Sequence, residues 1–350
     1  MSDKAPATTN RRTFLQMMAT LAIGGQALLR SGSLKAAIEE ATSSTDGWPK
    51  MTYRKLGRTG FNGSRLVFGC GAALSRGQAV NLLEPSFEAG VNVYDVGYSS
   101  YYGAAERNLG PFLKKRGDKI FAISKAPAGV RVGPNESVTV AQAGAAAQSW
   151  LKEMDKSLSE MQVEHIDAYY VMGSNSPSLI SSEEIYSAFQ KAKQAGKVSY
   201  FGISTHENAE AVLEAAIETG WYDLMQIAIT PAGWYDWNSK SVLAGTKDMF
   251  SLQPLLARAR EAGIGLIGMK AGRHLAGRGF LAGKAANAFD PFYDIKFLAN
   301  NLNTFQRSYA FVLAHGLDAV NADMQIFRHL KENFVATATS QDHFQDRLDT

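Results

Sequence analysis

Hydrophobic positions along the chain follow two alternating patterns from about residue 64 onward. Short apolar runs of strand length alternate with longer segments in which apolar residues recur every three or four positions, as on one face of a helix. The apolar runs predict strands at residues 65–70, 91–95, 119–124, 166–172, 198–204, 224–229, 264–269 and 318–322. The longer segments predict helices at residues 78–89, 104–115, 141–160, 183–195, 208–219, 252–262, 303–314 and 326–338.

Eight strands that are each followed by a helix are typical of an α/β fold, the closed (β/α)8 barrel of the TIM type. An open, doubly wound sheet shares this alternation and is the alternative. Against it, the Gly69, Cys70, Gly71 segment at the first strand lacks the third glycine of a dinucleotide-binding GxGxxG turn. Residues 52–64 are predicted to form an N-terminal β-hairpin, which we expect to plug the bottom of the barrel.

Two long loops interrupt the alternation, at residues 230–250 and 271–294. Loops of this length usually form lids or binding edges. The first contains Trp234, Tyr235 and Trp237, whose rings cover either a substrate or an exposed strand end.

The bulk composition excludes several classes of function. Hydrophobic residues make up 45% and charged residues 20% of the 350 residues, as in ordinary globular proteins. The formal net charge is only +3 with no long basic run, so we expect a small-molecule partner and no nucleic acid. The single cysteine, Cys70, excludes a disulfide, a zinc–thiolate cluster or an iron–sulfur site built from this chain alone. The six histidines lack the spacing of metal ligands, so we predict no metal site.

The amino-terminal segment resembles a twin-arginine export signal. Arg11 and Arg12 stand before an apolar run in which Phe14 and Leu15 match that motif, while Gln16 replaces its common lysine. A fortuitous basic helix end is the alternative, and the run is too short and too rich in glycine and alanine for a membrane span. We therefore predict a signal at residues 1–36, a linker at 37–50 and the barrel at 51–350.

This resemblance implies the twin-arginine export machinery as a partner and the periplasm as the location. That route carries folded proteins, often with a cofactor already bound. Contact with a membrane is expected only through the signal, if the signal stays uncleaved.

Polar side chains lie at or near the predicted strands. Asp95, Ser204 and Thr205 end their strands, Lys125 and Lys270 follow theirs, and Gln226 lies within the sixth. Because the carboxyl ends of parallel barrel strands meet on one face, most of these groups are expected to converge there. A lysine beside a tyrosine is expected to lower the pKa of the phenol, and an aspartate paired with the lysine keeps it charged and oriented. Such a tyrosine can donate a proton to a carbonyl oxygen as hydride reaches the carbon. Lys270 and Arg273 after the seventh strand contact either phosphate or water.

Six segments in a fixed order resemble the aldo-keto reductases, over about residues 53–336. They read YRKLGRTGFNGSRLVFG, AGVNVYDVGYSSYYGAAERNLG, FAISKA, HIDAYYVM, QAGKVSYFGISTH and AGIGLIGMK. The resemblance implies hydride transfer between NADP or NAD and a small carbonyl or alcohol substrate. It places Asp95, Tyr102 and Lys125 at three of four catalytic positions, with Tyr102 preferred to Tyr101 because it directly precedes Gly103.

The same resemblance implies how the cofactor is held. Ser204, Thr205 and Gln226 would contact the nicotinamide carboxamide. Residues 323–333 would face the adenosine phosphate, with Arg328 and Asn333 as the contacts.

Three departures from the family pattern bear on function. Met172 stands where the family places a catalytic histidine, and its thioether can neither donate a hydrogen bond nor titrate. His165 precedes that strand and is expected at the opposite end of the barrel. The loop before Tyr102 is longer than usual, and Asp323 replaces a glycine, which disfavours a 2′-phosphate.

Three functional hypotheses follow. The leading one is an exported oxidoreductase with Tyr102 as acid and base, Lys125 tuning its pKa and Asp95 orienting the lysine. The alternative is a non-enzymatic nucleotide-binding or partner-binding protein on the same barrel, because Met172 replaces the histidine. The third is an exported protein that retains its loaded cofactor and recycles it between two substrates.

Overall fold

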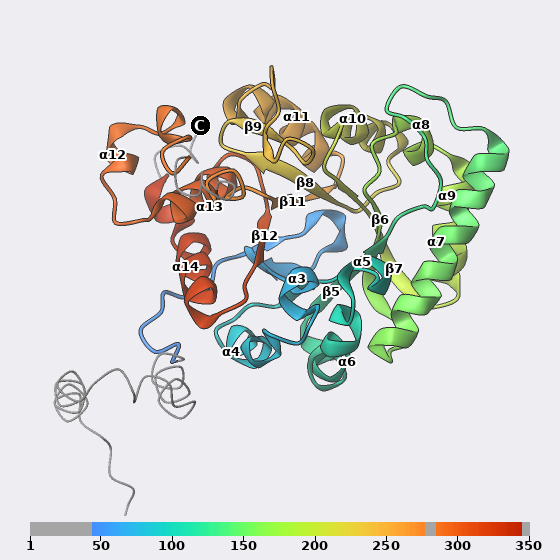
Figure 1. Ribbon diagram of the computed structural model, residues 1–350, viewed down its shortest axis with the longest axis horizontal. Helices are drawn as coiled ribbons and strands as arrows, with labels where there is room; N and C mark the ends of the chain where they lie inside the picture. Colours follow the sequence, from blue (N-terminus) through green and yellow to red (C-terminus); the bar gives the residue numbers. More distant parts are fainter. Residues whose placement is uncertain (1–43, 277–284, 345–350) are drawn as a thin grey trace, which may run out of the picture. The chain divides into compact units, whose positions relative to one another are not determined.

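The computed structural model describes residues 44–276 and 285–344 (Figure 1). The chain divides into two units, residues 1–46 and 47–350, and everything below concerns the second. The predicted signal at 1–36 and the first part of the predicted linker lie outside the described residues. No helix in the described ranges is long and apolar enough to cross a membrane.

The core of the second unit is a closed barrel of parallel strands. Its strands are β3 (Leu66–Gly69), β4 (Val93–Asp95), β5 (Phe121–Ala126), β6 (Ile166–Met172), β7 (Val198–Thr205), β8 (Leu224–Thr230), β11 (Gly265–Met269) and β12 (Ala319–Asp323). Each strand pairs in parallel with the next, and β12 pairs with β3, so the sheet has no free edge. The predicted (β/α)8 barrel is confirmed, and the open sheet is wrong.

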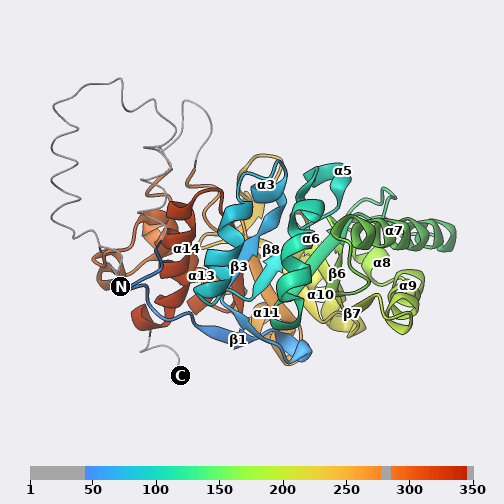
Figure 2. The same cartoon turned by 90° about the horizontal axis from the view of Figure 1, so that it is seen from below.

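Helices surround the strands on the outside of the barrel (Figures 1 and 2). The main ones are α4 (Leu83–Glu88), α6 (Ala105–Arg116), α7 (Val140–Met161), α9 (Glu183–Gln194), α10 (Ala209–Thr219), α11 (Met249–Glu261), α13 (Thr304–Ala314) and α14 (Phe327–Ala338). Side-chain caps set several of their starts. Thr139 and Asn303 form capping boxes with the residues three positions later, which satisfies backbone N–H groups that lack a partner in the first turn.

Several short elements were not predicted from the sequence: α3 (Cys70–Leu74), α5 (Ser99–Tyr102), α8 (Pro177–Ile180), α12 (Ile295–Leu298), β9 (Gly233–Asp236) and β10 (Ser241–Val242). A helix of four or five residues is too short to show the 3.6-residue period. Within the long loop that follows β8, strand β9 pairs antiparallel with β8, and β10 pairs antiparallel with β9.

The amino-terminal hairpin closes one end of the barrel. Its antiparallel strands are β1 (Tyr53–Lys55) and β2 (Asn62–Ser64). Between them, Leu56 is fully buried and packs with Val67 and Val93 of the barrel interior. Gly57 has φ +52°, and a Cβ there would lie 2.2 Å from the backbone nitrogen of Gly265. The predicted plug is therefore present, and it depends on a glycine at the point of closest approach.

Buried aspartates tie neighbouring strands together at this same end. Each accepts a hydrogen bond from a backbone N–H of the adjacent strand: Ala122 to Asp167 (2.8 Å), Phe201 to Asp223 (2.9 Å) and Leu266 to Asp318 (2.7 Å). Burial raises the pKa of each of these carboxyl groups. The carboxylates thus satisfy backbone donors where the strands begin.

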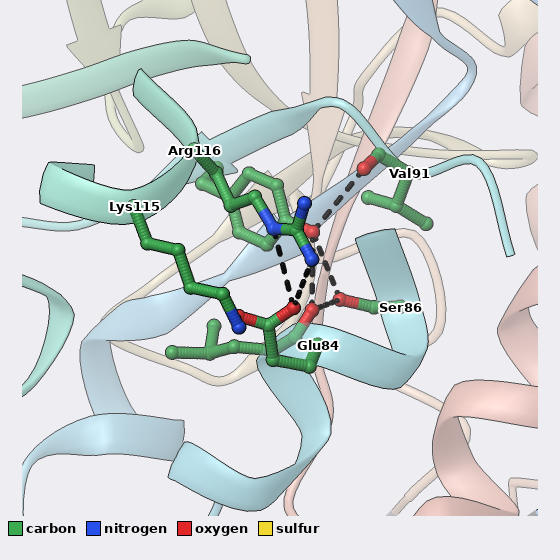
Figure 3. A network of polar contacts seen from close by, with 7 residues as sticks. Glu84, Ser86, Val91, Lys115 and Arg116 are labelled. Atoms are coloured by element: carbon green, nitrogen blue, oxygen red, sulfur yellow. Dashed lines mark hydrogen bonds and ion pairs between the residues drawn. The ribbon is translucent and has the colours of Figure 1, made fainter. Parts of the chain in front are cut away.

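A polar network on the outer side anchors β4 (Figure 3). The hydroxyl of Tyr94 contacts Ser86 Oγ at 3.0 Å and donates to the carbonyl of Val91 at 3.2 Å. Nearby, Glu84 of α4 pairs with Lys115 and Arg116 of α6 at 2.8 Å each (Figure 3). The ion pairs are partly exposed and contribute about 0–1 kcal/mol each. Because Asp95 directly follows Tyr94, this network also positions the carboxylate described next.

Candidate active site

A cavity of about 520 Å³ lies at the carboxyl ends of the barrel strands. Its volume is within the range of small-molecule and cofactor pockets, which is roughly 300–1,000 Å³. The strand ends contribute Gly69, Asp95, Lys125, Met172, Ser204, Gln226, Met269 and Asn321 to its lining. The first turns of α14 contribute Arg328, His329, Glu332 and Asn333.

Asp95 is the centre of a buried hydrogen-bond network. Lys125 Nζ donates to Asp95 Oδ1 and, at 2.7 Å, to the carbonyl of Val96. Gln226 Nε2 donates to Asp95 Oδ2 at 3.2 Å, and Asn321 Nδ2 donates to the same oxygen. Asp95 and Lys125 are each only 4% exposed, so each charge is compensated by the other and by these amides.

Asn321 is a member of this network that sequence reasoning missed. It lies in β12, between the apolar residues Val320 and Ala322. The local signal that could have found it is a polar residue between apolar neighbours within a strand, as for Gln226, but this pattern does not show that its partner is Asp95. Both polar atoms of Gln226 are engaged by the protein, because its Oε1 accepts from Ser204 Oγ at 3.1 Å.

Tyr102 lies at the end of α5 with its ring in a slot between two glycines. A Cβ at Gly71 would be 2.6 Å from ring atom Cε1, and one at Gly97 would be 2.7 Å from Cε2. The same Cβ at Gly97 would be 3.3 Å from Lys125 Cγ, so the lysine stem borders the slot. The hydroxyl of Tyr102 makes no hydrogen bond with another described residue, and Tyr102 lines the cavity.

The pKa of Tyr102 is raised, first by burial and then by the negative charge of Asp95. The expectation that Lys125 lowers this pKa is wrong. The Lys125 ammonium is paired with Asp95, so the two together present little net positive charge to the phenol. What remains is the cost of burying a phenolate, and Tyr102 is therefore protonated at neutral pH.

The residues expected to hold a cofactor are brought together with one exception. Those that line the cavity are Ser204, Gln226, Lys270, Arg273, Arg328 and Asn333. Thr205 does not line it; its side chain is buried and donates to the carbonyl of Glu207 at 2.7 Å. Burial and the charge of Lys125 lower the pKa of Lys270 to about 8.

His206, which the sequence analysis missed, forms an aromatic wall of the cavity together with Trp237 of the predicted aromatic loop. His206 follows β7 and Trp237 follows β9, and their ring centroids are 5.1 Å apart. The ammonium groups of Lys240 and Lys270 lie 2.9 and 4.9 Å from the Trp237 ring centroid. The sequence left open whether the rings of residues 230–250 cover a substrate or an exposed strand end. Trp237 lines the cavity.

The departures noted in the sequence have clear positions. Met172 lines the cavity. His165 instead contacts Ser199 Oγ at 2.9 Å, at the amino-terminal ends of β6 and β7. Tyr101 is 56% exposed and packs against Tyr102 with ring centroids 4.7 Å apart. Asp323 lines the cavity and accepts a hydrogen bond from Gln325 at 2.9 Å.

The cavity lining carries both positive and negative side chains. Lys270, Arg273 and Arg328 supply positive charge for phosphates, partly offset by Asp323 and Glu332. Within the described ranges, no group of three or more histidine, cysteine, aspartate or glutamate side chains has the arrangement of a metal site.

Known proteins resemble this chain in sequence and in structure. It is 28% identical over 169 residues to L-glyceraldehyde 3-phosphate reductase of Escherichia coli (strain K12), covering 45% of this chain and 46% of that protein. It is 26% identical over 250 residues to the uncharacterized oxidoreductase YrpG of Bacillus subtilis (strain 168), covering 67% and 69%. The chain thus spans about half the length of the first of these curated relatives.

Aldo-keto reductase AKR11C1 from Bacillus halodurans, solved in its holo form, has the same fold. The TM-score is 0.60 at 20% identity, over 85% of this chain and 96% of that one. A sequence model of the Aldo/keto reductase family matches residues 57–332, which include every cavity residue at the strand ends. The chain therefore belongs to the aldo/keto reductase family of oxidoreductases.

Proposed function

We propose that this protein reduces the carbonyl group of a small molecule with a nicotinamide dinucleotide. The observation that carries the proposal is the phenol of Tyr102, which has no hydrogen-bond partner among the described residues and lies in a cavity with the buried Asp95–Lys125 pair. A bound NADH or NADPH would supply the hydride to the carbonyl carbon. Tyr102 would donate its proton to the carbonyl oxygen at the same time.

Each residue of the network has a separate role in this proposal. Lys125 borders the slot that holds Tyr102, and its ammonium offsets the negative charge of Asp95 that would otherwise oppose the phenolate. Asp95 keeps Lys125 charged and fixed. Gln226 and Asn321 hold Asp95 by donating to its second oxygen.

The protonated phenol of Tyr102 suits the role of an acid. Carbonyl reduction requires a proton for the carbonyl oxygen, and burial and Asp95 both favour the protonated form of Tyr102. We therefore propose Tyr102 as the acid of the reduction, and the same residue would act as the base in the reverse oxidation.

The cofactor is proposed to be NADP or NAD, held by Ser204 and Gln226 at the strand ends and by Lys270, Arg273, Arg328 and Asn333 toward the phosphates. Asp323 lies in the same lining and opposes a 2′-phosphate electrostatically. We expect NADH to bind at least as tightly as NADPH. Fluorescence titration with both cofactors would decide this, and a strong preference for NADPH would contradict it.

Oxidation of NAD(P)H against a panel of aldehydes and quinones tests the reaction. Tyr102→Phe keeps the ring in its slot and removes only the proton donor. We expect the wild-type protein to turn over and the variant to lose about 10²–10⁴-fold in kcat, as for loss of a general acid. Equal rates in the two proteins would exclude Tyr102 from the chemistry.

The second candidate function is nucleotide or partner binding without catalysis. The observation that favours it is Met172, whose thioether lines the cavity and cannot polarise a carbonyl. In that case the wild-type protein would bind cofactor without turnover, and Met172→His would create activity. A robust wild-type rate excludes this function.

Export to the periplasm through the twin-arginine machinery is a proposal from the sequence alone. Replacing Arg11 and Arg12 by lysine in the full chain should keep the protein in the cytoplasm, as fractionation would show. Nicotinamide dinucleotide released from denatured, natively exported protein would support a retained cofactor. Loose binding in titration would contradict it.

A further inference from the structure

Most polar side chains at the carboxyl end of the barrel are already engaged. The donors bound to Asp95 or to one another are Lys125, Ser204, Gln226 and Asn321. Lys270 directs its ammonium over the ring of Trp237. Tyr102 and His206 line the cavity, and their side chains make no hydrogen bond with another described residue. The same holds for Tyr309, His329 and Asn333, which come from α13 and α14. Among these neutral groups, His206 is the one that directly follows a barrel strand, β7.

His206 faces the cavity because of the alternation of side chains along β7. Ser204 lines the cavity, Thr205 turns away to bind the carbonyl of Glu207, and His206 lines the cavity again. Ser204 is the register partner of Met172 on the neighbouring strand β6. His206 thus lies two residues after Ser204, the residue of β7 that pairs with Met172, and it lines the same cavity.

The surroundings of His206 keep its imidazole neutral. Burial lowers its pKa to about 3, assisted by the positive charges of Lys270, Lys125 and Lys240. A neutral imidazole has one N–H donor and one acceptor nitrogen. The ring packs against Trp237 at 5.1 Å, which limits its rotation. The group is thus an oriented, uncharged donor rather than a titrating acid.

We propose that His206 donates a hydrogen bond to the substrate carbonyl oxygen, beside Tyr102, and so performs the polarisation that Met172 cannot. The inference rests on the proposed carbonyl reduction and names a second residue for it. His206 keeps its proton throughout, while Tyr102 transfers its own. Both bonds strengthen as negative charge develops on the oxygen, so their effect is on the transition state.

Three variants test the assignment, with 4-nitrobenzaldehyde and NADPH as probes. His206→Phe keeps a ring against Trp237 and removes the donor, whereas His206→Gln keeps a donor. The double variant His206→Phe/Met172→His offers a new donor from the adjacent strand. His165→Phe, at the far end of the barrel, is the matched control.

We expect His206→Phe to lose on the order of 10²-fold in kcat, the cost of removing one preorganised donor, with the Kd for NADPH unchanged. His206→Gln should lose less than about tenfold, and the double variant should recover at least about tenfold over His206→Phe. His165→Phe should match the wild type. This combination distinguishes a donor from a packing role, because a histidine in place of Met172 supplies a donor and would not restore a merely structural loss.

Two different failures are separable. Wild-type turnover with an unchanged kcat in His206→Phe would overturn the assignment of His206 and leave the proposed function intact. A wild-type protein that binds NADPH but reduces no aldehyde or quinone would overturn the proposed function itself. A His206→Phe loss that neither the glutamine nor the double variant relieves, at unchanged cofactor affinity, would assign His206 to packing instead.

Discussion

The slot around Tyr102 makes Gly97→Ala a sharp test of how the phenol is positioned. The added Cβ would lie 2.7 Å from Cε2 and 2.8 Å from Cδ2 of the Tyr102 ring. Ordinary van der Waals contact begins at 3.4 Å, so the ring must move by about 0.7 Å. Direct retreat is restricted because Gly71 borders the opposite edge of the ring so closely that a Cβ there would lie 2.6 Å from Cε1. The ring is therefore expected to slide or tilt in the slot, which displaces its hydroxyl.

The cost follows from the size of that displacement. A misplacement of about 1 Å at a reacting group costs on the order of 10²-fold in rate. A shift of about 0.7 Å should therefore lower kcat by roughly 10- to 100-fold, equivalent to about 1.4–2.7 kcal/mol of transition-state stabilisation. Cofactor affinity should change little, because Gly97 is not part of the cavity lining.

Steady-state kinetics with NADPH and an aldehyde that the wild type reduces would measure this effect. Gly144→Ala is the matched control, since a Cβ there meets nothing within 4 Å and its φ lies outside the left-handed region. That change lies inside α7 and should leave kcat unchanged while stabilising the fold by about 0.5–1 kcal/mol. Gly97→Ala should also add nothing to Tyr102→Phe, because both act through the same hydroxyl.

A folded Gly97→Ala protein with kcat within twofold of the wild type would refute this reasoning. So would a further large loss when the change is added to Tyr102→Phe. Thermal unfolding of each variant would separate a displaced ring from a destabilised barrel.

Three further predictions concern charge. Asp95→Asn leaves Lys125 buried without its counter-ion, so the free energy of unfolding in urea should fall by about 3–5 kcal/mol. Adding Lys125→Met should restore most of that loss. Full stability of the single variant would contradict the buried pair. Asp167→Ala should lower the free energy of unfolding by about 1–3 kcal/mol, because the buried N–H of Ala122 loses its acceptor. Asp167→Asn keeps an acceptor and should lower it less. Equal losses in the two variants would argue against that hydrogen bond. The pKa of Lys270 is lowered to about 8, so its side chain is charged below that pH and neutral above it. The Kd for NADPH should therefore rise as the pH passes from 7 to 9. This rise should vanish in Lys270→Met.

Much of the barrel could be predicted from the chain because its pattern is local. The apolar runs and helical periods reflect burial within single elements, so β6 was placed with its observed bounds and the other barrel strands within a few residues. The hairpin was likewise predicted, whereas the close approach of Gly57 to Gly265 was not. Short elements such as α3 and α5 were not, because they contain little more than one turn.

The site was predictable as a set of residue types but not as a network. Asp95 and Lys125 were found because each ends or follows a strand, and parallel strands bring such positions to one face. Asn321 was not found, since its partner Asp95 is 226 positions away and no local pattern joins them. Thr205 shows the converse error, because its position next to Ser204 says nothing about which way its side chain turns.

The sequence by itself determined the fold class, the strand ends that carry polar groups and the replacement of a histidine by Met172. Only the tertiary structure decided the protonation of Tyr102 and the environment of His206, because both depend on burial and on charges from other strands. The sequence predicted a lowered pKa for Tyr102 from a neighbouring lysine. The fold pairs that lysine with Asp95 and buries the phenol, and the cost of desolvation then outweighs the attraction.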